Sequence, residues 1–294
     1  MVVSVDDLAC LDVLLWLQTG SATSERLGFS QSTISRRVQR VADLLRLKIL
    51  KEDGAWEVVG DTTILGLERV VHQQYRWVRD LPLRIEAQHA SVLPNCECLP
   101  GGWLMGNLDF LGISTPLKLL RDGVIDAWIA CFPDVPGEHD ADVVCFHLTR
   151  TPAQLIAANG HPVLQSADGL MLNGVRRYPV LALAADASPG VSAGLEELGL
   201  RSVVSRISRY QFDRWEGRIL RDLLLGYASA YAIDQSDLPI VSLPIALPWE
   251  FGDTLVVKRA FASSVRFQEL LNYLQGKALA LSRESPQVRV YEPG

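Results

Sequence analysis

The clearest pattern of apolar and polar residues lies between residues 30 and 45. In this stretch, SQSTISRRVQRVADLL, apolar side chains recur at steps of four, three and four, at Ile34, Val38, Val41 and Leu45. This spacing places one apolar stripe on a helix and leaves the glutamine, threonine and arginine side chains on its other faces. Ser30 can cap such a helix, because its hydroxyl can accept from backbone N–H groups two or three residues ahead. The pattern predicts an amphipathic helix with a buried side and a basic exposed side.

The residues before this helix predict two further helices. Ser4 and Asp7 stand at capping-box spacing, and the apolar residues after them predict a first helix over residues 4–18, ended by Gly20. A second helix of little more than one turn is expected over residues 23–27, closed by Gly28. A helix, a turn and a capped basic helix in this order are typical of a helix-turn-helix.

A hairpin and a long helix are predicted after residue 45. Residues 47–51 and 55–59 are expected to be strands joined by a turn at Asp53 and Gly54, which would form the wing of a winged helix-turn-helix. Residues 62–81 then carry a set of side chains at heptad spacing, one of them polar: Ile64, Leu67, Val71, Gln74 and Val78. A long helix with such a stripe and no neighbouring helix of its own is expected to bury it against a second copy, as a linker-helix dimer.

From residue 82 the pattern changes to short apolar runs separated by helical stretches, which is typical of an α/β domain with largely parallel strands. Strands are predicted over residues 83–87, 108–112, 126–131, 143–148, 154–158, 180–184, 202–207, 230–233, 240–243 and 255–258. Helices are predicted over residues 116–121, 193–198, 213–225 and 263–281.

Length, charge and cysteine content narrow the class of protein. A chain of 294 residues suits a small domain joined to a larger one of about 200 residues. The net charge is -6, yet residues 26–51 hold seven basic side chains against one acid, so positive charge is local, as a docking face for DNA requires. The odd number of cysteines, five, and the lack of a signal-peptide pattern predict a reducing cytoplasm. No apolar run reaches the ~18 residues that a membrane span needs.

The sequence GSATSERLGFSQSTISRRVQRVADLLRLKIL at residues 20–50, with a wing and a long helix after it, resembles LysR-type transcriptional regulators. Further matching stretches are RDGVIDAWIA at residues 121–130, GHP at 160–162 and LVVKRAFASSVRFQELLNYL at 255–274, so that the resemblance spans residues 5–281. It implies a winged helix-turn-helix over residues 1–61, a linker helix over 62–81, an effector-binding domain over 82–281 and a tail over 282–294. The effector-binding domain would be built like a periplasmic solute-binding protein, with subdomain I at about 82–150 and 252–281 and subdomain II at about 151–251.

The basic helix supplies the candidate DNA contacts, because phosphate neutralisation and bidentate contact to guanine both need arginine on an exposed side. Gln31, Thr33 and Arg36 are expected at base edges, and Arg37, Arg40 and Lys48 at phosphates. The full set of candidate DNA-binding residues is Gln31, Ser32, Thr33, Ser35, Arg36, Arg37, Arg40 and Lys48. A solvated helix face is the alternative interpretation of the arginines taken alone.

In two-lobed sensor domains, ligands bind where strand ends and helix starts converge, because free backbone N–H groups and short hydroxyls there can bind anions. The candidate effector-binding residues are His89, Ser91, Ser114, Thr115, Phe132, Tyr210 and Tyr231. Thr115 and Ser91 rank first, since the resemblance places them at the family's usual hydroxyl positions. Helix capping is the alternative role for Ser114 and Thr115, and core packing for Tyr210 and Tyr231.

The resemblance implies a DNA-binding regulator and not an enzyme. Its expected partners are double-stranded DNA with an interrupted inverted repeat, a small-molecule effector such as an organic acid or other anion, and further copies of the chain in a dimer or tetramer. RNA polymerase is a further candidate partner, and no cofactor or membrane is expected. The alternative is a DNA-binding regulator whose degenerate sensor domain binds no metabolite and contacts proteins instead, which the prolines and glycines of residues 91–102 would favour by breaking the usual helix there.

The sequence also contains weak signals for hydrolase chemistry and for metal or thiol chemistry. Residues 190–194 spell the Gly-x-Ser-x-Gly of a hydrolase nucleophile elbow around Ser192, but all five histidines precede that serine, against the order of that fold. Cys96 and Cys98, with His89 nearby, could hold a soft metal or form a redox pair, although two cysteines one residue apart make a strained disulfide. Cys131 and Cys145 stand in apolar runs and are expected to be packing residues.

Overall fold

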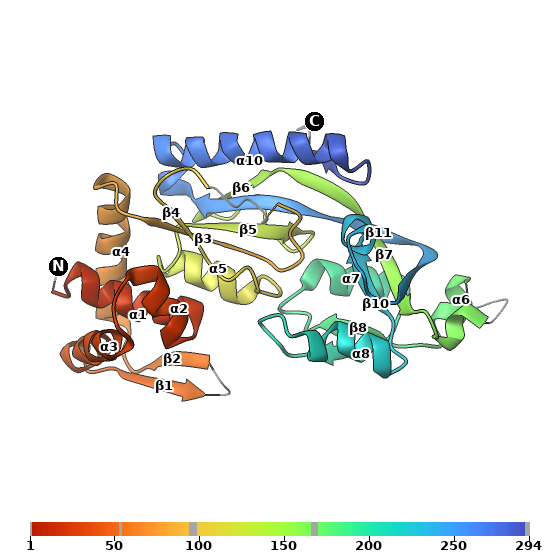
Figure 1. Ribbon diagram of the computed structural model, residues 1–294, viewed down its shortest axis with the longest axis horizontal. Coiled ribbons are helices and arrows are strands. Elements are labelled where there is room, and N and C mark those ends of the chain that lie inside the picture. The colour runs from red at the N-terminus through yellow and green to blue at the C-terminus, as the bar shows by residue number, and fades with distance from the viewer. Residues whose placement is uncertain (1, 53–54, 94–98, 166–169, 292–294) are drawn as a thin grey trace. The chain divides into compact units, whose positions relative to one another are not determined.

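The computed structural model describes residues 2–52, 55–93, 99–165 and 170–291, and the chain divides into two compact units. Unit 1 comprises residues 1–86, 101–107 and 117–128, and unit 2 comprises residues 87–100, 108–116 and 129–294. Figure 1 labels most of the helices and strands of both units. The domain boundaries expected from the sequence remain predictions, because the division into units follows other lines.

Unit 1 begins with three helices, α1 (Val5–Leu17), α2 (Gly20–Leu27) and α3 (Gln31–Leu45). Each has a hydroxyl cap: Ser4 accepts from Asp7 N–H, Thr19 from Ala22 N–H and Ser30 from Thr33 N–H. The first and third helices are as predicted. The second was predicted too short, because its cap is Thr19 and Gly20 is its first residue. The first helix ends at Leu17, and its C-cap Gln18 adopts the left-handed conformation.

Apolar side chains from these helices and the following strands form the core of the N-terminal part of unit 1. Leu8 and Leu11 of α1 pack with Ile34, Val38 and Val41 of α3, all of them buried. The next two strands, β1 (Lys48–Glu52) and β2 (Ala55–Val59), pair antiparallel from Lys48 opposite Val59 to Glu52 opposite Ala55. The predicted strand pair is thus confirmed, while its turn at residues 53–54 lies outside the described residues.

Helix α4 (Thr63–Val78) follows, and its two faces are exchanged relative to an ordinary amphipathic helix. Its buried face is largely polar and comprises Leu65, Glu68, Arg69, His72, Gln73, Arg76 and Trp77. Its exposed face is apolar: Ile64 is 50% exposed, Leu67 61%, Val71 47% and Val78 64%. The heptad stripe expected from the sequence therefore lies open on this chain.

The polar face of α4 is buried because ion pairs hold it within unit 1. Arg76 donates to the Asp126 carboxylate at 3.0 and 3.1 Å, and Asp126, which is fully buried, also accepts from Gln73. Arg69 donates to Asp12 of α1 at 2.8 Å. Buried charges are tolerated only when paired and hydrogen-bonded in this way.

The same network continues into the strand β3 (Leu83–Ala87) of unit 1. Arg84 lies 3.7 Å from Asp12, its backbone N–H donates to Asp126 and its guanidinium donates to the Val124 carbonyl at 2.9 Å. Burial, and then the charge of Arg76, lowers the pKa of Arg84 to about 10, so it stays protonated at neutral pH. The Trp16 indole of α1 donates to the Glu86 carboxylate at 2.8 Å.

Within the described residues, the larger of the two remaining sheets has eight strands in the order β10-β7-β11-β5-β3-β4, with β6 paired to β11 and β12 to β7. Its further strands are β4 (Trp103–Met105), β5 (Ala127–Phe132), β6 (Val143–His147), β7 (Thr149–Ala158), β10 (Gly226–Ser229), β11 (Ile240–Lys258) and β12 (Arg289–Val290). The pairs of β7 with β10, β11 and β12, and of β11 with β6, are antiparallel. The expectation of largely parallel strands is wrong for these pairs, though β3 and β4 run parallel, Leu83 opposite Trp103.

The second sheet pairs β8 (Val180–Leu183) parallel with β9 (Ser202–Ser205). The helices α5 (Ser114–Arg121), α6 (Leu172–Val175), α7 (Pro189–Glu197), α8 (Glu216–Arg221), α9 (Ala230–Asp234) and α10 (Val265–Glu284) complete the fold. In unit 2, α10 packs along β6 through Phe146 and Phe267, whose ring centroids are 5.3 Å apart (Figure 1).

Several predicted elements of the larger domain differ from the structure. Residues 230–233 were predicted as a strand, but Ser229 caps a helix there by accepting from Ala232 N–H. Residues 108–112 form only isolated bridges, at Phe110. Strand β11 runs unbroken over residues 240–258, where two strands were predicted, because ladder pairing with β7 continues through its proline-containing middle with shifts of register.

We predict that replacing Asp126 with alanine destabilises the protein by ~3–5 kcal/mol, because Arg76 would keep a buried charge without its partner. Urea denaturation followed by tryptophan fluorescence measures this loss. The matched control is Asp213→Ala, which removes an exposed partner of Arg221 and should change stability by less than about 1 kcal/mol. Equal effects of the two substitutions would show that the buried pair has no special role.

Candidate functional site

The exposed surface of α3 gathers most of the candidate DNA-binding residues. Gln31, Ser32, Ser35, Arg36 and Arg40 are exposed, and Thr33 and Arg37 are half-buried. They share this side of the helix because the opposite side packs in the core through its apolar stripe. Lys48 is exposed at the start of β1.

The three arginines of α3 differ in their contacts. Arg36 reaches only its own helix, with its guanidinium 3.3 Å from the Ser32 carbonyl and 3.4 Å from the Thr33 hydroxyl. The Arg37 guanidinium, by contrast, is paired with Asp6 at 3.0 Å and Asp7 at 3.4 Å.

Arg37 and Arg40 also serve the packing of α3 on its neighbours. The Arg37 guanidinium lies 4.5 Å from the centre of the Phe29 ring, and only 22% of the Arg37 side chain is exposed. Arg40 pairs with Asp7 at 3.1 Å but keeps 67% of its side chain exposed. Arg36 and Arg40 are therefore available to an outside partner, whereas Arg37 is largely occupied in holding α3 to the start of α1.

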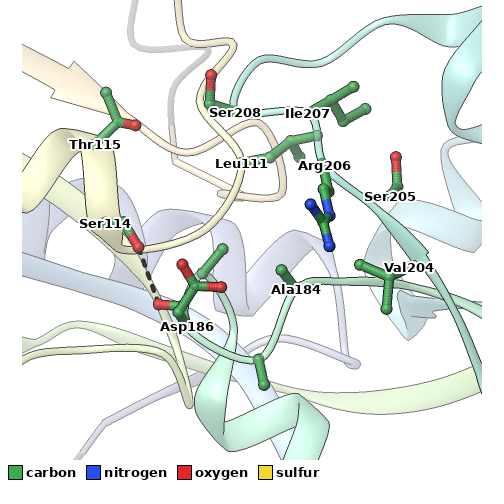
Figure 2. A pocket seen from close by; sticks show the side chains of 12 residues that line it. Leu111, Ser114, Thr115, Ala184, Asp186, Val204, Ser205, Arg206, Ile207 and Ser208 are labelled. Atoms are coloured by element: carbon green, nitrogen blue, oxygen red, sulfur yellow. Dashed lines mark hydrogen bonds between the residues drawn. The ribbon is translucent and has the colours of Figure 1, made fainter.

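Unit 2 contains a polar pocket of about 510 Å³ at the ends of β8 and β9, which we call the hydroxyl pocket. It is lined by Leu111, Ser114, Thr115, the segment 184–187 and the segment 204–208. Ser114 donates to the Asp186 carbonyl at 2.9 Å (Figure 2). Figure 2 also shows the Arg206 side chain extending into the space above Ala184. Hydroxyl groups, the exposed Arg206 guanidinium and the Asp186 carboxyl group are the polar groups of this pocket.

A smaller cavity of about 160 Å³, also within unit 2, has a different lining, and we call it the aromatic cavity. His89, Phe110, Trp215, Tyr227 and Phe251 supply its rings. Asp134 and Glu216 supply carboxyl groups, and burial raises the pKa of both. The Asp134 carboxylate is engaged with the start of α7, where it accepts from the Ser188 hydroxyl and from Gly190 N–H.

The seven predicted effector residues do not form one cluster. Ser114 and Thr115 line the hydroxyl pocket, and His89 lines the aromatic cavity. The Tyr210 ring stacks on His89, with ring centroids 3.5 Å apart. Tyr231 stands on the short helix α9 and is half-buried, outside the lining of both pockets.

Ser91 and Phe132 have structural partners instead. Ser91 donates to Asp253, a fully buried carboxylate that also accepts from Val92 N–H at 3.1 Å and from the Thr149 hydroxyl at 3.0 Å. Phe132 lies against the Arg150 guanidinium, 4.0 Å from its ring centre. Both residues belong to contacts around the predicted crossovers near residues 149–152 and 248–252, and neither lines the hydroxyl pocket or the aromatic cavity.

Sequence reasoning missed the charged and aromatic residues that give each pocket its character. Arg206 follows β9 and Asp186 follows β8, where parallel strands end together, so strand topology could have indicated them. Trp215 and Glu216 lie in the segment 213–225, which was predicted as one continuous helix, and Tyr227 lies just beyond it on β10. These side chains come together because the chain leaves helix α8 at Arg221 and enters strand β10 at Gly226. No local sequence pattern indicated this change.

The described residues give little support to a hydrolase nucleophile at Ser192 or to reactive cysteines. Ser192 lies inside α7 rather than at a strand-to-helix elbow, and a side chain at Gly194 would collide with the Trp249 ring, which explains the small residues. Burial raises the pKa of the Cys10, Cys131 and Cys145 thiols to about 11, 12 and 11, which disfavours the reactive thiolate. Cys96 and Cys98 lie outside the described residues.

Metal-binding clusters and membrane-spanning helices are both absent from the described part of the chain. It contains no group of three or more histidine, cysteine, aspartate or glutamate side chains placed to hold a metal ion. None of its helices is both long enough and apolar enough to cross a membrane.

The fold of the chain is similar to those of full-length LysR-type transcriptional regulators. A full-length OxyR variant from Pseudomonas aeruginosa is 18% identical, with a TM-score of 0.55 and 99% of each chain covered. CbnR, a LysR family transcriptional regulator, is 12% identical, with a TM-score of 0.52 and 93% of this chain and 98% of its own covered. No protein-family model matches the chain, and no curated protein matches it by sequence.

Two more solved structures agree with this fold. CbnR in complex with its target DNA is 11% identical, with a TM-score of 0.55 and 93% and 99% of the two chains covered. ArgP from Mycobacterium tuberculosis is 15% identical, with a TM-score of 0.51 and 92% and 95% covered. The sequence-based resemblance to LysR-type regulators is confirmed at the level of the fold.

We predict that Asp253 makes the stability of the protein fall as the pH rises from about 4 to about 6. Burial raises the pKa of Asp253 to about 6, so the folded protein retains a proton that the unfolded chain has already lost in this range. The contribution lost is about 3 kcal/mol. Asp253→Asn removes the titration, so the difference in free energy of unfolding between the two proteins should change with pH in this interval and be constant above pH 7. A difference independent of pH would contradict the assignment.

Proposed function

We propose that this protein is a sequence-specific DNA-binding transcriptional regulator of the LysR type, controlled by a small-molecule effector bound in its sensor domain. The observation that carries the proposal is the exposed polar side of α3, where Gln31, Ser32, Ser35 and Arg36 stand free of the core on a capped helix. A helix presented in this way by a helix-turn-helix enters the major groove of DNA. The fold shared with CbnR in complex with its target DNA supports the same function.

The contacts of the three arginines divide their proposed roles. Arg36 contacts only its own helix, so its guanidinium can turn to the O6 and N7 atoms of a guanine. Gln31 and Thr33, one turn nearer the start of the helix, are proposed to read neighbouring bases. Arg40 and Lys48 are proposed to bind phosphates, because both are exposed beside the reading surface. Arg37 supports this surface through Asp6, Asp7 and Phe29.

The exposed apolar face of α4 supports a dimer. Ile64, Leu67, Val71 and Val78 recur along one side of this helix, and each is about half exposed or more. Their exposure is costly in water, and a second copy of the same helix presents a complementary stripe. The dimer would bring two α3 helices to successive major grooves about one helical turn apart, so the operator should be an interrupted inverted repeat. A tetramer through the sensor domains is a further proposed assembly.

The hydroxyl pocket is the proposed site for the effector, and an organic acid or other anion is the proposed ligand class. Thr115 and Arg206 offer hydrogen-bond donors around a volume that suits a metabolite, and Ser114 lines the same pocket. Binding would bias closure of the sensor about the crossovers near residues 149–152 and 248–252, and so alter the spacing or bend that the dimer imposes on DNA.

The second candidate function is a regulator whose sensor domain binds protein partners and no metabolite. The short, proline- and glycine-containing segment 91–102 motivates it. The two functions differ in one observable quantity, because a metabolite that binds only the folded state raises the melting temperature saturably. The pocket of about 510 Å³ favours the effector-controlled regulator.

We predict that Arg36→Ala weakens binding to a DNA duplex selected by the wild-type protein by ~1–3 kcal/mol and relaxes base preference at one position of each half-site. Fluorescence anisotropy on the selected duplex and on single-base variants measures both effects. Gln39→Ala is the matched control on the same helix, since Gln39 is bound to Asp43 at 2.7 Å. Unchanged affinity and base preference for Arg36→Ala would place the reading surface elsewhere.

A further inference from the structure

We propose that Gln18 is a positioning residue for DNA binding: its side chain holds the strand pair β1–β2 in place, so that Lys51 of β1 contacts a DNA phosphate. Neither residue is among the DNA contacts proposed above. This role rests on the proposed function, because it applies only to a protein that binds DNA. It concerns the strand pair rather than the exposed side of α3.

The Gln18 side chain is bound to the backbone of β2 through both of its polar atoms. Its Oε1 atom accepts from the Trp56 N–H, and its Nε2 atom donates to the Trp56 carbonyl at 3.3 Å. The same Nε2 atom donates to the Leu15 carbonyl of α1 at 2.7 Å. Among the described residues, no other side chain makes a hydrogen bond to β1 or β2. One amide group therefore ties β2 to the end of α1.

The backbone of Gln18 does not by itself explain a glutamine at this position. Gln18 has φ 65° and ψ -1°, the left-handed conformation in which glycine is the least costly residue. A helix end of this kind needs no amide side chain. The half-buried side chain of Gln18 is instead accounted for by its two hydrogen bonds to Trp56.

Trp56 transmits this anchor to Lys51. The two residues are opposite each other in the antiparallel ladder, and the Lys51 ammonium lies 5.7 Å from the centre of the Trp56 ring. The base of the strand pair is held separately, because Leu47 N–H donates to the Ala42 carbonyl of α3 at 2.8 Å. Lys51 stands toward the other end of the ladder, so its position depends on Trp56 and hence on Gln18.

Lys51 has the charge and the exposure that contact with DNA requires. Its side chain is exposed and has no acidic partner among the described residues. Its acidic neighbours Glu52 and Glu57 lie on the opposite face of the strand pair, since side chains alternate along a strand. An exposed ammonium group beside a DNA-reading helix can neutralise a phosphate and fix the protein on the duplex.

Gln18 also lies close to the reading end of α3. Helix α2 begins at Gly20, two residues after Gln18. A Cβ atom at Gly20 would lie 3.9 Å from the Gln31 side chain, so the start of α2 lies beside the first residue of α3. The anchor of β2 is therefore next to the residue proposed to read a base. A phosphate contact from Lys51 would flank the bases that α3 reads.

The test measures the affinity of the full-length protein for a duplex that it selects from a random pool, over a range of salt concentrations. Each phosphate contact that is lost reduces the slope of log affinity against log salt by about 1. Gln18→Met keeps the length of the side chain and removes the amide. It should reduce the slope by about 1 and leave base preference at the α3 positions unchanged, and Lys51→Gln should do the same. Gln275→Met, on an exposed residue of α10, is the matched control and should keep the wild-type slope.

Double variants show whether Gln18 acts through Lys51. Gln18→Met combined with Lys51→Gln should reduce the slope no further than either change alone. Gln18→Met combined with Lys48→Gln should give additive reductions, because Lys48 is at the other end of the ladder.

Gln18→Gly guards against misfolding. Glycine suits the left-handed end of α1, so this variant should keep the wild-type circular dichroism spectrum while its salt slope falls as in Gln18→Met.

Three results would overturn the role of Gln18 alone, in a wild-type protein that binds DNA. They are an unchanged salt slope in both Gln18→Met and Gln18→Gly, additive reductions when Gln18→Met is combined with Lys51→Gln, and altered base preference at the α3 positions. A wild-type protein that selects no duplex would overturn the proposed function, and the role of Gln18 with it.

Discussion

The buried ion pairs of α4 are the constraint on which unit 1 depends. Arg76 and Asp126, with Arg69 and Asp12, place charges where water does not reach, and such charges are tolerated only because each is paired. By turning its polar side inward, α4 leaves its apolar side outward. The same pairing that fixes the helix in one copy therefore creates the surface on which we propose that a second copy docks. Loss of one pair would loosen the helix that carries the proposed dimer contact.

The exposed side of α3 depends on a separate set of ion pairs, between α3 and α1. Arg37 is committed to Asp6 and Asp7, which stand in the first turn of α1, while Arg36 remains available. The three arginines look alike in sequence, but their contacts differ. Arg37 holds α3 in place, whereas Arg36 and Arg40 have exposed side chains that we propose contact DNA. The two pockets of unit 2 divide comparably, since one offers hydroxyls with Arg206 and the other offers aromatic rings with Glu216.

Local patterns predicted the helix-turn-helix and its strand pair well, because hydroxyl caps such as Ser4 and Ser30 and the stripe from Ile34 to Val41 act within a few residues. They failed where the decisive contact is distant. Thr19 was overlooked as a cap because Gly20 was taken for a helix end. The buried side of α4 could not be predicted, since Arg69 and Arg76 look solvent-exposed until Asp12 and Asp126 are brought to them.

The candidate ligand sites were predicted least well for the same reason. Ser114 and Thr115 follow a rule about helix starts and line a pocket, but Glu216 and Arg206 reach their pockets only through contacts with segments far along the chain. Ser91 shows the opposite error, because its hydroxyl matched a family position yet binds Asp253 in this structure. Position in the chain indicated where a ligand could bind, and tertiary contacts decided which side chains were free to bind it.

The most direct test of the account is selection of DNA duplexes from a random pool by the full-length protein, followed by footprinting of the enriched sequence. The account predicts an interrupted inverted repeat whose two half-sites are centred about one helical turn apart and are protected together. Leu67→Glu, which places a charge on the exposed apolar face of α4, should protect both half-sites only at much higher concentration. Enrichment of no sequence, or of a single half-site bound by one copy, would contradict it.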